Sequence, residues 1–269
     1  GLTLVVLGMV YNGLFKLDFE NLRIASVLGR IGLAWSIAAV LYLNFGVKTR
    51  AAIAVAVLAG YGALSALVAA PDAAGAGPLT FEGNLAGYID RQFLPGKLIY
   101  GSFDPEGLLS TVPAVVTAML GMFTGEFVRR GDIRGGRKTL WMAAAAAALL
   151  AAGLAFSGVL PVNKKLWSST FVCVVGAYSL GMFALFYYLI DVRGWRRWTL
   201  FFRVVGLNSI TIYLAQRIVG FGRISDFFLG GIASKCPEAV AAVISSAGYV
   251  AVCWLFLYFL YRKNVFLKV

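Results

Sequence analysis

The sequence of 269 residues has no histidine and only three cysteines, and both shortages exclude classes of site. Without histidine, the chain supplies no imidazole that could act as a base or bind a metal. The cysteines, Cys173, Cys236 and Cys253, are scattered, so they form neither a disulfide framework nor a metal-binding spacing. Residues 1–15 lack a charged n-region and a cleavage site, so we do not expect them to be a signal peptide.

Apolar residues are abundant instead. Hydrophobic residues make up 60% of the chain, against about 45–50% in ordinary soluble domains, and the mean hydropathy is +0.82. The hydrocarbon core of a bilayer is about 30 Å thick, and a helix needs about 20 apolar residues to cross it. Because runs of that length recur along the chain, the sequence predicts an all-α, polytopic integral membrane helix bundle.

The apolar residues form eight segments, at 1–15, 22–45, 51–70, 108–128, 140–159, 169–190, 200–219 and 239–261. The first is too short to span a bilayer and starts without a methionine or a basic cap, so we expect it to be a truncated N-terminal helix. The others predict about seven full transmembrane helices. No internal repeat is evident, so we expect a single domain over residues 1–269, with an outer loop at 71–107.

The net charge of +12 is explained by the loops rather than by a nucleic-acid partner. Cytoplasmic loops of membrane proteins collect Lys and Arg. One set of loops holds fourteen basic residues, which are Lys48, Arg50, Arg129, Arg130, Arg134, Arg137, Lys138, Arg193, Arg196, Arg197, Arg203, Arg262, Lys263 and Lys268. The other set holds nine basic and nine of the twelve acidic residues. We therefore expect a cytoplasmic C-terminus, and the short loops without a glycosylation sequon favour a bacterial inner membrane.

The polar stretch at 83–107, GNLAGYIDRQFLPGKLIYGSFDPEG, interrupts the apolar runs. It carries the charged residues Asp90, Arg91, Lys97, Asp104 and Glu106. A connection this long in a compact bundle is more often functional than passive. We expect it to lie on the outer side, against a membrane-embedded site.

The motif Asp104-Pro105-Glu106-Gly107 at the end of this stretch has two interpretations. It can start the next helix, with Asp as the cap, Pro at the first position and Glu in the first turn. Alternatively, two carboxylates at a bilayer boundary can accept hydrogen bonds from sugar hydroxyls or act as a base toward an ammonium group. Both interpretations stay open at this point.

Polar residues inside the apolar segments are further candidates. Arg30 lies about eight residues from the outer end of its segment, or roughly 12 Å deep. An arginine at the centre of a span costs on the order of 3 kcal/mol, so we expect it to face a cavity or an ion-pair partner. In the seventh segment Asn208 is followed by Ser209, Tyr213 and Gln216 on one helix face. This stripe lines a polar cavity or forms hydrogen bonds between helices.

The short loop at 160–167, LPVNKKLW, carries two lysines on the side where basic residues are scarce. Lys164 and Lys165 could hold an anionic or sugar ligand. The alternative is that both lysines extend toward water beside Trp167 in an interfacial aromatic belt.

Five strings occur in one order from residue 22 to the end: GYIDRQFL, FDPEGLLSTVPAVVTAMLGMFTGE, PVNKKLWSS, FFRVVGLNSITIYL and LYFLYRKNVFLKV. In sequence, order and spacing they resemble the heparan-alpha-glucosaminide N-acetyltransferase family and its bacterial relatives. The resemblance implies an integral-membrane acyltransferase that takes acetyl from cytosolic acetyl-coenzyme A. It delivers the acetyl group across the bilayer to the amine of a terminal glucosamine.

The resemblance also extends to single positions, namely Arg30, Glu106, Asn163, Lys164, Trp167 and Asn208. The chain departs from the family at Ser26, Gly29 and Leu207, where the family commonly has Gly, Gln and Met. The larger departure is the missing histidine. The resemblance implies a catalytic histidine in a more N-terminal region, which we expect upstream of this chain.

The predicted site has three parts. The catalytic candidates are Asp104, Glu106 and Asn208. The candidates for binding acetyl-coenzyme A are Arg30, Arg129, Arg130, Arg193, Ser209 and Tyr213. The candidates for binding the sugar are Asp90, Arg91, Asn163, Lys164 and Trp167.

Two other functions remain open. One is an inner-membrane transporter of amino sugars or N-acetylglucosamine, because a polar stripe in a bundle serves transport as well as catalysis. The other is a structural remnant without activity of its own. The expected partners are the lipid bilayer and a small amino sugar, with a homodimer as a candidate assembly and no nucleic acid.

Overall fold

A computed structural model describes residues 1–267. Lys268, one of the basic residues assigned above to the cytoplasmic loops, lies outside the described residues. The described chain is helical and contains no strand. It divides into two compact units, Gly1–Gly194 and Trp195–Val269, which we call unit 1 and unit 2. The single domain predicted for residues 1–269 stays a prediction.

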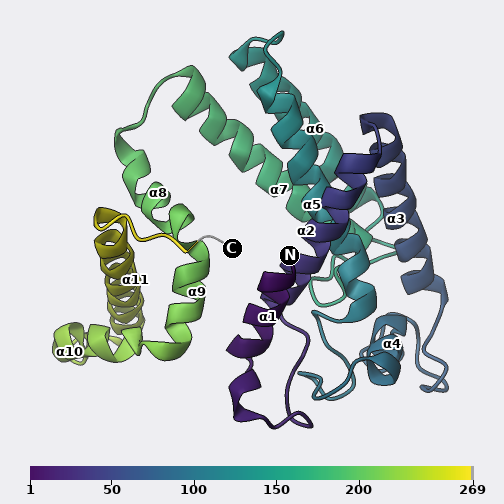
Figure 1. Ribbon diagram of the computed structural model, residues 1–269, viewed down its shortest axis with the longest axis horizontal. Helices are drawn as coiled ribbons and strands as arrows, with labels where there is room; N and C mark the ends of the chain where they lie inside the picture. Colours follow the sequence, from purple (N-terminus) through teal and green to yellow (C-terminus); the bar gives the residue numbers. More distant parts are fainter. Residues whose placement is uncertain (268–269) are drawn as a thin grey trace. The chain divides into compact units, whose positions relative to one another are not determined.

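Unit 1 holds seven of the α-helices drawn in Figure 1. They are α1 (Leu2–Tyr11), α2 (Val27–Asn44), α3 (Val47–Leu67), α4 (Leu85–Phe93), α5 (Leu108–Arg129), α6 (Gly135–Ala155) and α7 (Ser169–Tyr187). A short 3-10 turn at Leu14–Lys16 follows α1, and a π-helical turn at Tyr188–Val192 extends α7.

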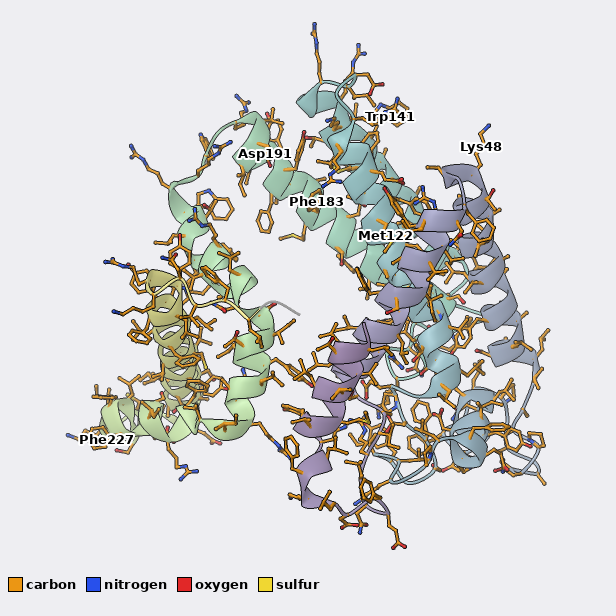
Figure 2. The ribbon with its side chains drawn as sticks, in the orientation of Figure 1. Lys48, Met122, Trp141, Phe183, Asp191 and Phe227 are labelled. Carbon is orange, nitrogen blue, oxygen red and sulfur yellow. The ribbon has the colours of Figure 1, made fainter. Side chains whose placement is uncertain are left out.

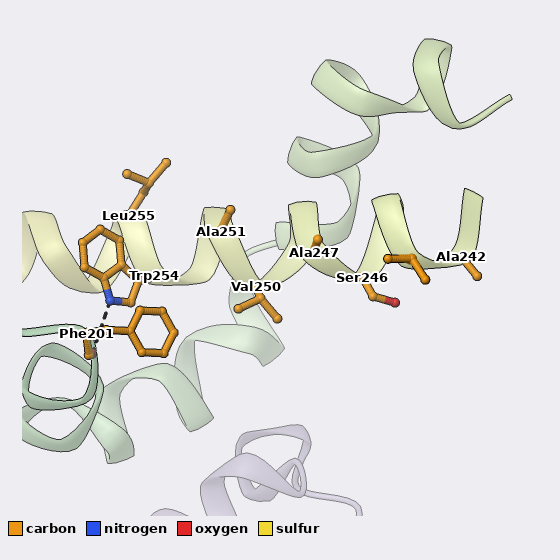
Figure 3. Close-up of a pocket in the computed structure, with 9 residues that line it drawn as sticks. Phe201, Ala242, Ser246, Ala247, Val250, Ala251, Trp254 and Leu255 are labelled. Carbon is orange, nitrogen blue, oxygen red and sulfur yellow. Dashed lines mark hydrogen bonds between the residues drawn. The ribbon is translucent and has the colours of Figure 1, made fainter. Parts of the chain in front are cut away.

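Unit 2 holds α8 (Leu200–Leu207), α9 (Ser209–Ile218), α10 (Phe221–Ala233) and α11 (Glu238–Arg262), preceded by a 3-10 turn at Arg197–Thr199. Its core includes Ala215, Phe221 and Cys253. An apolar groove of about 840 Å³ runs along α11, and Figure 3 draws the residues that line it. Beside it the Trp254 indole donates to the Phe201 carbonyl at 3.3 Å. An apolar face of this kind suits a helix that lies in a bilayer.

Within residues 1–267, six helices are long and apolar enough to cross a membrane, and the number rises to seven if α8 and α9 count as one bent span. The six are α2, α3, α5, α6, α7 with its π-helical extension, and α11. The prediction of an all-α, polytopic membrane helix bundle is therefore confirmed. α1 has 10 residues, too few to cross the bilayer on its own.

The core of unit 1 lies where α2, α3, α5 and α7 meet. It is formed by Ala34, Ala38, Ala54, Ala114, Val115, Val116, Met119 and Val172. In a membrane, helices associate through close van der Waals packing rather than through exclusion of water. Alanines at the crossing points permit that approach, and they leave the larger apolar side chains facing lipid.

The structure differs from the sequence-based expectation in three elements. The segment 200–219, predicted as one helix, is bent by 60° between the turn that begins at Arg197 and α9. At the break, Asn208 leaves the helical conformation, and its side chain accepts a hydrogen bond from the Thr211 hydroxyl at 3.0 Å and donates one to the Val265 carbonyl at 3.2 Å. α4 and α10 were not expected, since they are short and lie in stretches interpreted as loops.

Candidate functional site

The helices of unit 1 alternate in direction, so their ends collect at two opposite ends of the unit. α2, α5 and α7 begin at the end where α3 and α6 stop, and α4 lies beside α5 at this end (Figure 1). We call it the carboxylate end, because it holds Asp90, Asp104 and Glu106. Figure 2 shows Lys48, Trp141 and Asp191 toward the other end, which we call the basic end.

Arg23 is the central cation of the carboxylate end. Its Nε donates to Asp104 Oδ2 at 2.7 Å, and its Nη2 donates to Asp104 Oδ1 at 2.6 Å. The same Nη2 also donates to the Glu106 carboxylate. A two-point arginine–carboxylate pair is strong and sets the relative orientation of both groups. Sequence analysis missed Arg23; the signal was a basic residue seven positions before Arg30, on the side where basic residues are scarce.

The backbone around Arg23 is held by two sets of contacts. The Asn12 side chain donates to the Arg23 carbonyl at 2.7 Å and to the Ala25 carbonyl at 2.9 Å. On the other side, Arg23 forms an isolated antiparallel bridge with Gly96. Gly96 has a φ of +80°, and a Cβ there would lie 2.1 Å from the Leu22 carbonyl oxygen. Only glycine fits this approach without displacing the loop.

Asp104 is completely buried and its carboxylate is fully occupied. Besides Arg23, it accepts the backbone N–H of Ile99 at 3.2 Å and of Glu106 at 3.0 Å. α5 begins at Leu108 and its N-cap is Gly107, without a side-chain cap. The helix-start interpretation of this motif is therefore wrong: Asp104 does not cap α5, and Pro105 and Glu106 precede it.

The cap of α5 comes from α4. Asp90, which is fully buried, accepts the Leu108 N–H at 2.9 Å and the Asp104 N–H at 3.4 Å. A Cβ on Gly107 would lie 2.0 Å from Asp90 Oδ2, so the contact depends on glycine. Burial, with a smaller contribution from the Asp104 carboxylate, raises the pKa of Asp90 to about 6 against the two backbone hydrogen bonds.

Glu106 is the most accessible carboxylate of this group, with 18% of its side-chain surface exposed. It shares Arg23 with Asp104, and burial of Arg23 would by itself lower the pKa of that guanidinium. The hydrogen bonds from both carboxylates outweigh the burial and raise the pKa of Arg23. Arg23 therefore stays charged, and Glu106 keeps one side toward the surface.

Arg30 lies at the carboxylate end as well. It is the fourth residue of α2, so the predicted depth of eight residues is wrong. The reason is the Ser26 side chain, which caps α2 by accepting the Gly29 N–H at 2.9 Å and so delays the start of the helix. The Arg30 guanidinium lies 4.7 Å above the Trp167 ring, and its Nη2 donates to the Pro105 carbonyl and, at 2.5 Å, to Ser110 Oγ.

The loop 160–167 brings Trp167 to this end. The Trp167 indole donates to Thr117 Oγ1 at 3.2 Å. The Asn163 side chain accepts the backbone N–H of Lys165 at 2.8 Å, so it shapes the turn. Lys164 is exposed, whereas the Lys165 ammonium lies 4.5 Å from the centre of the Tyr100 ring.

Arg91 extends away from the carboxylate group, although it lies on α4 with Asp90. It pairs with Asp72 at 2.7 Å and donates to the Ser102 carbonyl at 2.6 Å. The hydrogen bond from Arg91 lowers the pKa of Asp72 below its usual value. Arg91 thus links α4 to two other segments of the outer loop, at Asp72 and at Ser102.

The arginines predicted to bind the coenzyme lie at the basic end, apart from Arg30. Arg129 is in the last turn of α5. Arg130 is exposed and pairs with Asp132 at 2.6 Å, and Arg193 donates to the Tyr188 hydroxyl at 2.8 Å. The hydrogen bond with Asp132 raises the pKa of Arg130. All three therefore lie apart from the carboxylate group, and their role in binding the coenzyme stays a prediction.

The remaining predicted residues belong to unit 2. Asn208 is buried and donates to the Val265 carbonyl at 3.2 Å. Ser209 begins α9, and Tyr213 lies one turn further along the same helix. These contacts hold the C-terminal segment against the broken helix.

The fold and this site define a class: an integral membrane protein with a buried cluster of charges at one end of its helix bundle. No protein-family model matches the chain. Among curated proteins, it is 29% identical over 208 residues to the heparan-alpha-glucosaminide N-acetyltransferase of Homo sapiens. It is 27% identical over 205 residues to the same protein of Mus musculus.

Each match covers 70% of this chain and 30% of the relative, so the chain spans about a third of the length of the curated relatives it matches. The two matches support a family-level relationship with the heparan-alpha-glucosaminide N-acetyltransferases. The resemblance stated from the five sequence strings is confirmed at that level.

Proposed function

We propose that this chain forms part of a membrane acetyltransferase. It moves acetyl from cytosolic acetyl-coenzyme A to the amine of a glucosamine-type sugar on the opposite side of the membrane. The observation that carries the proposal is the Arg23–Asp104–Glu106 cluster beside Arg30, in a chain related to membrane N-acetyltransferases.

We assign to Glu106 the binding of the sugar amine and the acceptance of its proton. Its carboxylate is partly exposed, and Arg23 orients it without burying it. An ionised carboxylate in this position can hydrogen-bond the sugar ammonium and take a proton as the amine reacts. Asp104 has no lone pair free for substrate, so we assign it to positioning Glu106 through Arg23 and through the Glu106 N–H.

The remaining candidates for the sugar site differ in whether their side chains are accessible or bond within the protein. Trp167 is partly accessible at the carboxylate end, and the exposed Lys164 can reach an acidic or hydroxyl group of a neighbouring sugar unit. Asp90, Asn163 and Arg91 bond mainly to backbone or to a loop carboxylate. We assign these three to shaping the sugar site.

The acetyl donor is a substrate with several phosphates. Arg129, Arg130 and Arg193 fit that chemistry, because guanidinium groups at a surface attract and orient phosphate oxygens. With the basic end toward the cytosol, these arginines hold the nucleotide part while the acetyl group extends toward Arg30. The other candidates from the sequence, Asn208 as a catalytic residue and Ser209 and Tyr213 as coenzyme-binding residues, belong to unit 2, and their roles stay proposals.

The test uses the intact natural protein in detergent with isotope-labelled acetyl-coenzyme A and glucosamine. Glu106→Gln keeps the shape of the side chain and removes its basicity, so acetyl transfer should fall about 100-fold or more. Glu82→Gln, in the same outer loop and exposed, is the matched control and should keep wild-type turnover. Unchanged transfer in Glu106→Gln would remove this residue from the mechanism.

A transporter of amino sugars is the second candidate, and the bent α8–α9 pair favours it. Interrupted helices are typical of substrate sites in transporters. Uptake of labelled N-acetylglucosamine into vesicles without acetyl-coenzyme A would support transport, whereas transfer that depends on acetyl-coenzyme A would support the enzyme.

A further inference from the structure

Arg30 has more hydrogen-bonding capacity than its surroundings use. It is 5% exposed, and its Nε and Nη1 are buried without a hydrogen-bond partner among the described residues. A guanidinium carries five N–H donors. The two on Nη2 are directed to Pro105 and Ser110, so three donors remain free.

Arg50 provides an internal comparison. It is also 5% exposed, and its Nε and Nη1 are likewise unpartnered. It also lies over aromatic rings, at 4.5 Å from Tyr42 and 5.5 Å from Phe123. Arg50 is however paired with Glu126 at 2.8 Å, whereas no ion pair among residues 1–267 includes Arg30.

Carboxylates in the neighbourhood offset the charge of Arg30, but buried donors that lack an acceptor still carry an unfavourable desolvation cost. The bonded nitrogen of Arg30, Nη2, lies against polar groups, namely the Pro105 carbonyl and Ser110 Oγ, so the guanidinium is at a polar turn rather than in the apolar core. Buried polar atoms that the protein leaves unpaired commonly mark positions that a ligand completes. Because arginine has only donors, the ligand atom must be a hydrogen-bond acceptor.

The charges around Arg30 decide which acceptor fits. Glu106, Asp104 and Asp90 all interact electrostatically with Arg30, and Arg23 is the other cation of the group. The field of these three carboxyl groups would therefore oppose the binding of a phosphate or carboxylate. An uncharged oxygen that gains negative charge only during the reaction avoids that repulsion and still benefits from Arg30.

We propose that Arg30 donates hydrogen bonds to the carbonyl oxygen of the acetyl group and stabilises the negative charge that develops there. This inference rests on the proposed acetyltransferase function. The role differs from phosphate binding, because it places Arg30 at the reacting atoms. Trp167, stacked under the guanidinium, and Ser110 hold it in position.

The lone pair of the sugar amine forms the C–N bond, and the π electrons of the C=O bond move to the oxygen that Arg30 contacts. When that pair re-forms the C=O bond, the C–S bond breaks and sulfur leaves with its electrons. The amine proton passes to Glu106 and then to sulfur, giving an acetamide and a free thiol.

The experiment measures the infrared stretch of acetyl-coenzyme A that is isotope-labelled at its carbonyl carbon and bound to the intact protein. Hydrogen bonds from Arg30 lower this frequency below that of the free thioester in water. In Arg30→Gln the band should return toward the free value, and kcat should fall about 100- to 1,000-fold, with KM changed much less. Arg30→Lys keeps the charge but not the fork of donors, and it should show an intermediate band.

Arg50→Gln is the matched control, since it removes an equally buried arginine at the basic end. It should lower the thermal midpoint without moving the band. Binding by the wild type with no band shift relative to the free thioester overturns the assignment of Arg30, whether or not the variants fold. Equal shifts in the Arg30 and Arg50 variants also overturn it. Failure of the wild type to bind acetyl-coenzyme A overturns the proposed function itself, which is a different result.

Discussion

The ion pairs at the two ends of unit 1 differ in burial and in the sequence separation of their partners. At the carboxylate end, Arg23 pairs with Asp104, 81 positions further along the chain, and Asp104 is fully buried. At the basic end, Arg130 pairs with Asp132, two positions away, and both are exposed. The pair of Arg50 with Glu126, 76 positions apart, is the buried exception at the basic end.

Buried long-range ion pairs and exposed local ion pairs have different physical consequences. A long-range buried pair exists only when the helices have assembled, so its free energy is coupled to folding and its geometry is rigid. A local exposed pair adds little stability, and its partners can exchange with solutes. The carboxylate end therefore has the rigidity that a reaction centre needs, and the basic end has the accessibility that suits an incoming anion.

The largest expected effect comes from breaking the buried pair. Arg23→Met leaves Asp104 as an uncompensated buried carboxylate and should lower the free energy of unfolding by about 3–5 kcal/mol. Arg130→Met, which breaks the exposed pair, should leave it unchanged within error. Thermal or denaturant unfolding in detergent measures both. If adding Asp104→Asn to Arg23→Met recovers no stability, the buried-charge explanation is wrong.

A somewhat smaller effect should appear in the pH dependence of stability. The folded pKa of Asp90 is about 6 and the ordinary value is 3.8, so the folded state binds its proton more tightly than the unfolded state. The stability that this proton supplies is fully present below pH 3.8 and is lost as the pH rises through about 6. The shift in the pKa of Asp90 corresponds to a change of about 3 kcal/mol at most in the free energy of unfolding.

Asp90→Asn removes this titration. The loss of stability between pH 4 and pH 6.5 should therefore be smaller in the variant than in the wild type, as measured by thermal midpoints at the two values. The carboxyl groups that the two proteins share cancel in the comparison. Identical slopes would mean that the Asp90 carboxyl titrates normally in the folded protein.

Gly107→Ala should have a moderate effect. The new methyl would lie 2.0 Å from Asp90 Oδ2, so either α4 or the start of α5 must shift. Overpacking of this kind costs about 1–3 kcal/mol. Gly121→Ala is the control in the same helix, because nothing lies within 4 Å of a Cβ there. A loss of equal size in both variants would contradict the role of the Asp90 contact.

The smallest effect should come from single arginines at the basic end. Arg130→Met should raise KM for acetyl-coenzyme A about 2- to 5-fold, and added salt should reduce the difference, because an exposed charge is screened. Lys97→Met, at an exposed position of the outer loop, should leave KM unchanged. Steady-state kinetics at low and high ionic strength distinguish these cases.

The sequence by itself determined the helices and the polar island. Hydropathy is a local property, so runs of about 20 apolar residues predict membrane helices whatever their partners are. The island at 83–107 is recognisable for the same reason. Local signals also explain the misses. α4 and α10 are short, with 9 and 13 residues, and the break at Asn208 falls within an otherwise continuous apolar run.

Only the tertiary structure decided how the charges are paired. Arg23, Asp90 and Asp104 come from a loop, from α4 and from the turn before α5, and nothing in their spacing indicates that they meet. Glu106 pairs with Arg23, while two nitrogens of Arg30 stay without a partner among the described residues. Such pairings depend on which helix ends are brought together by packing, and packing is a property of the whole unit rather than of any one segment.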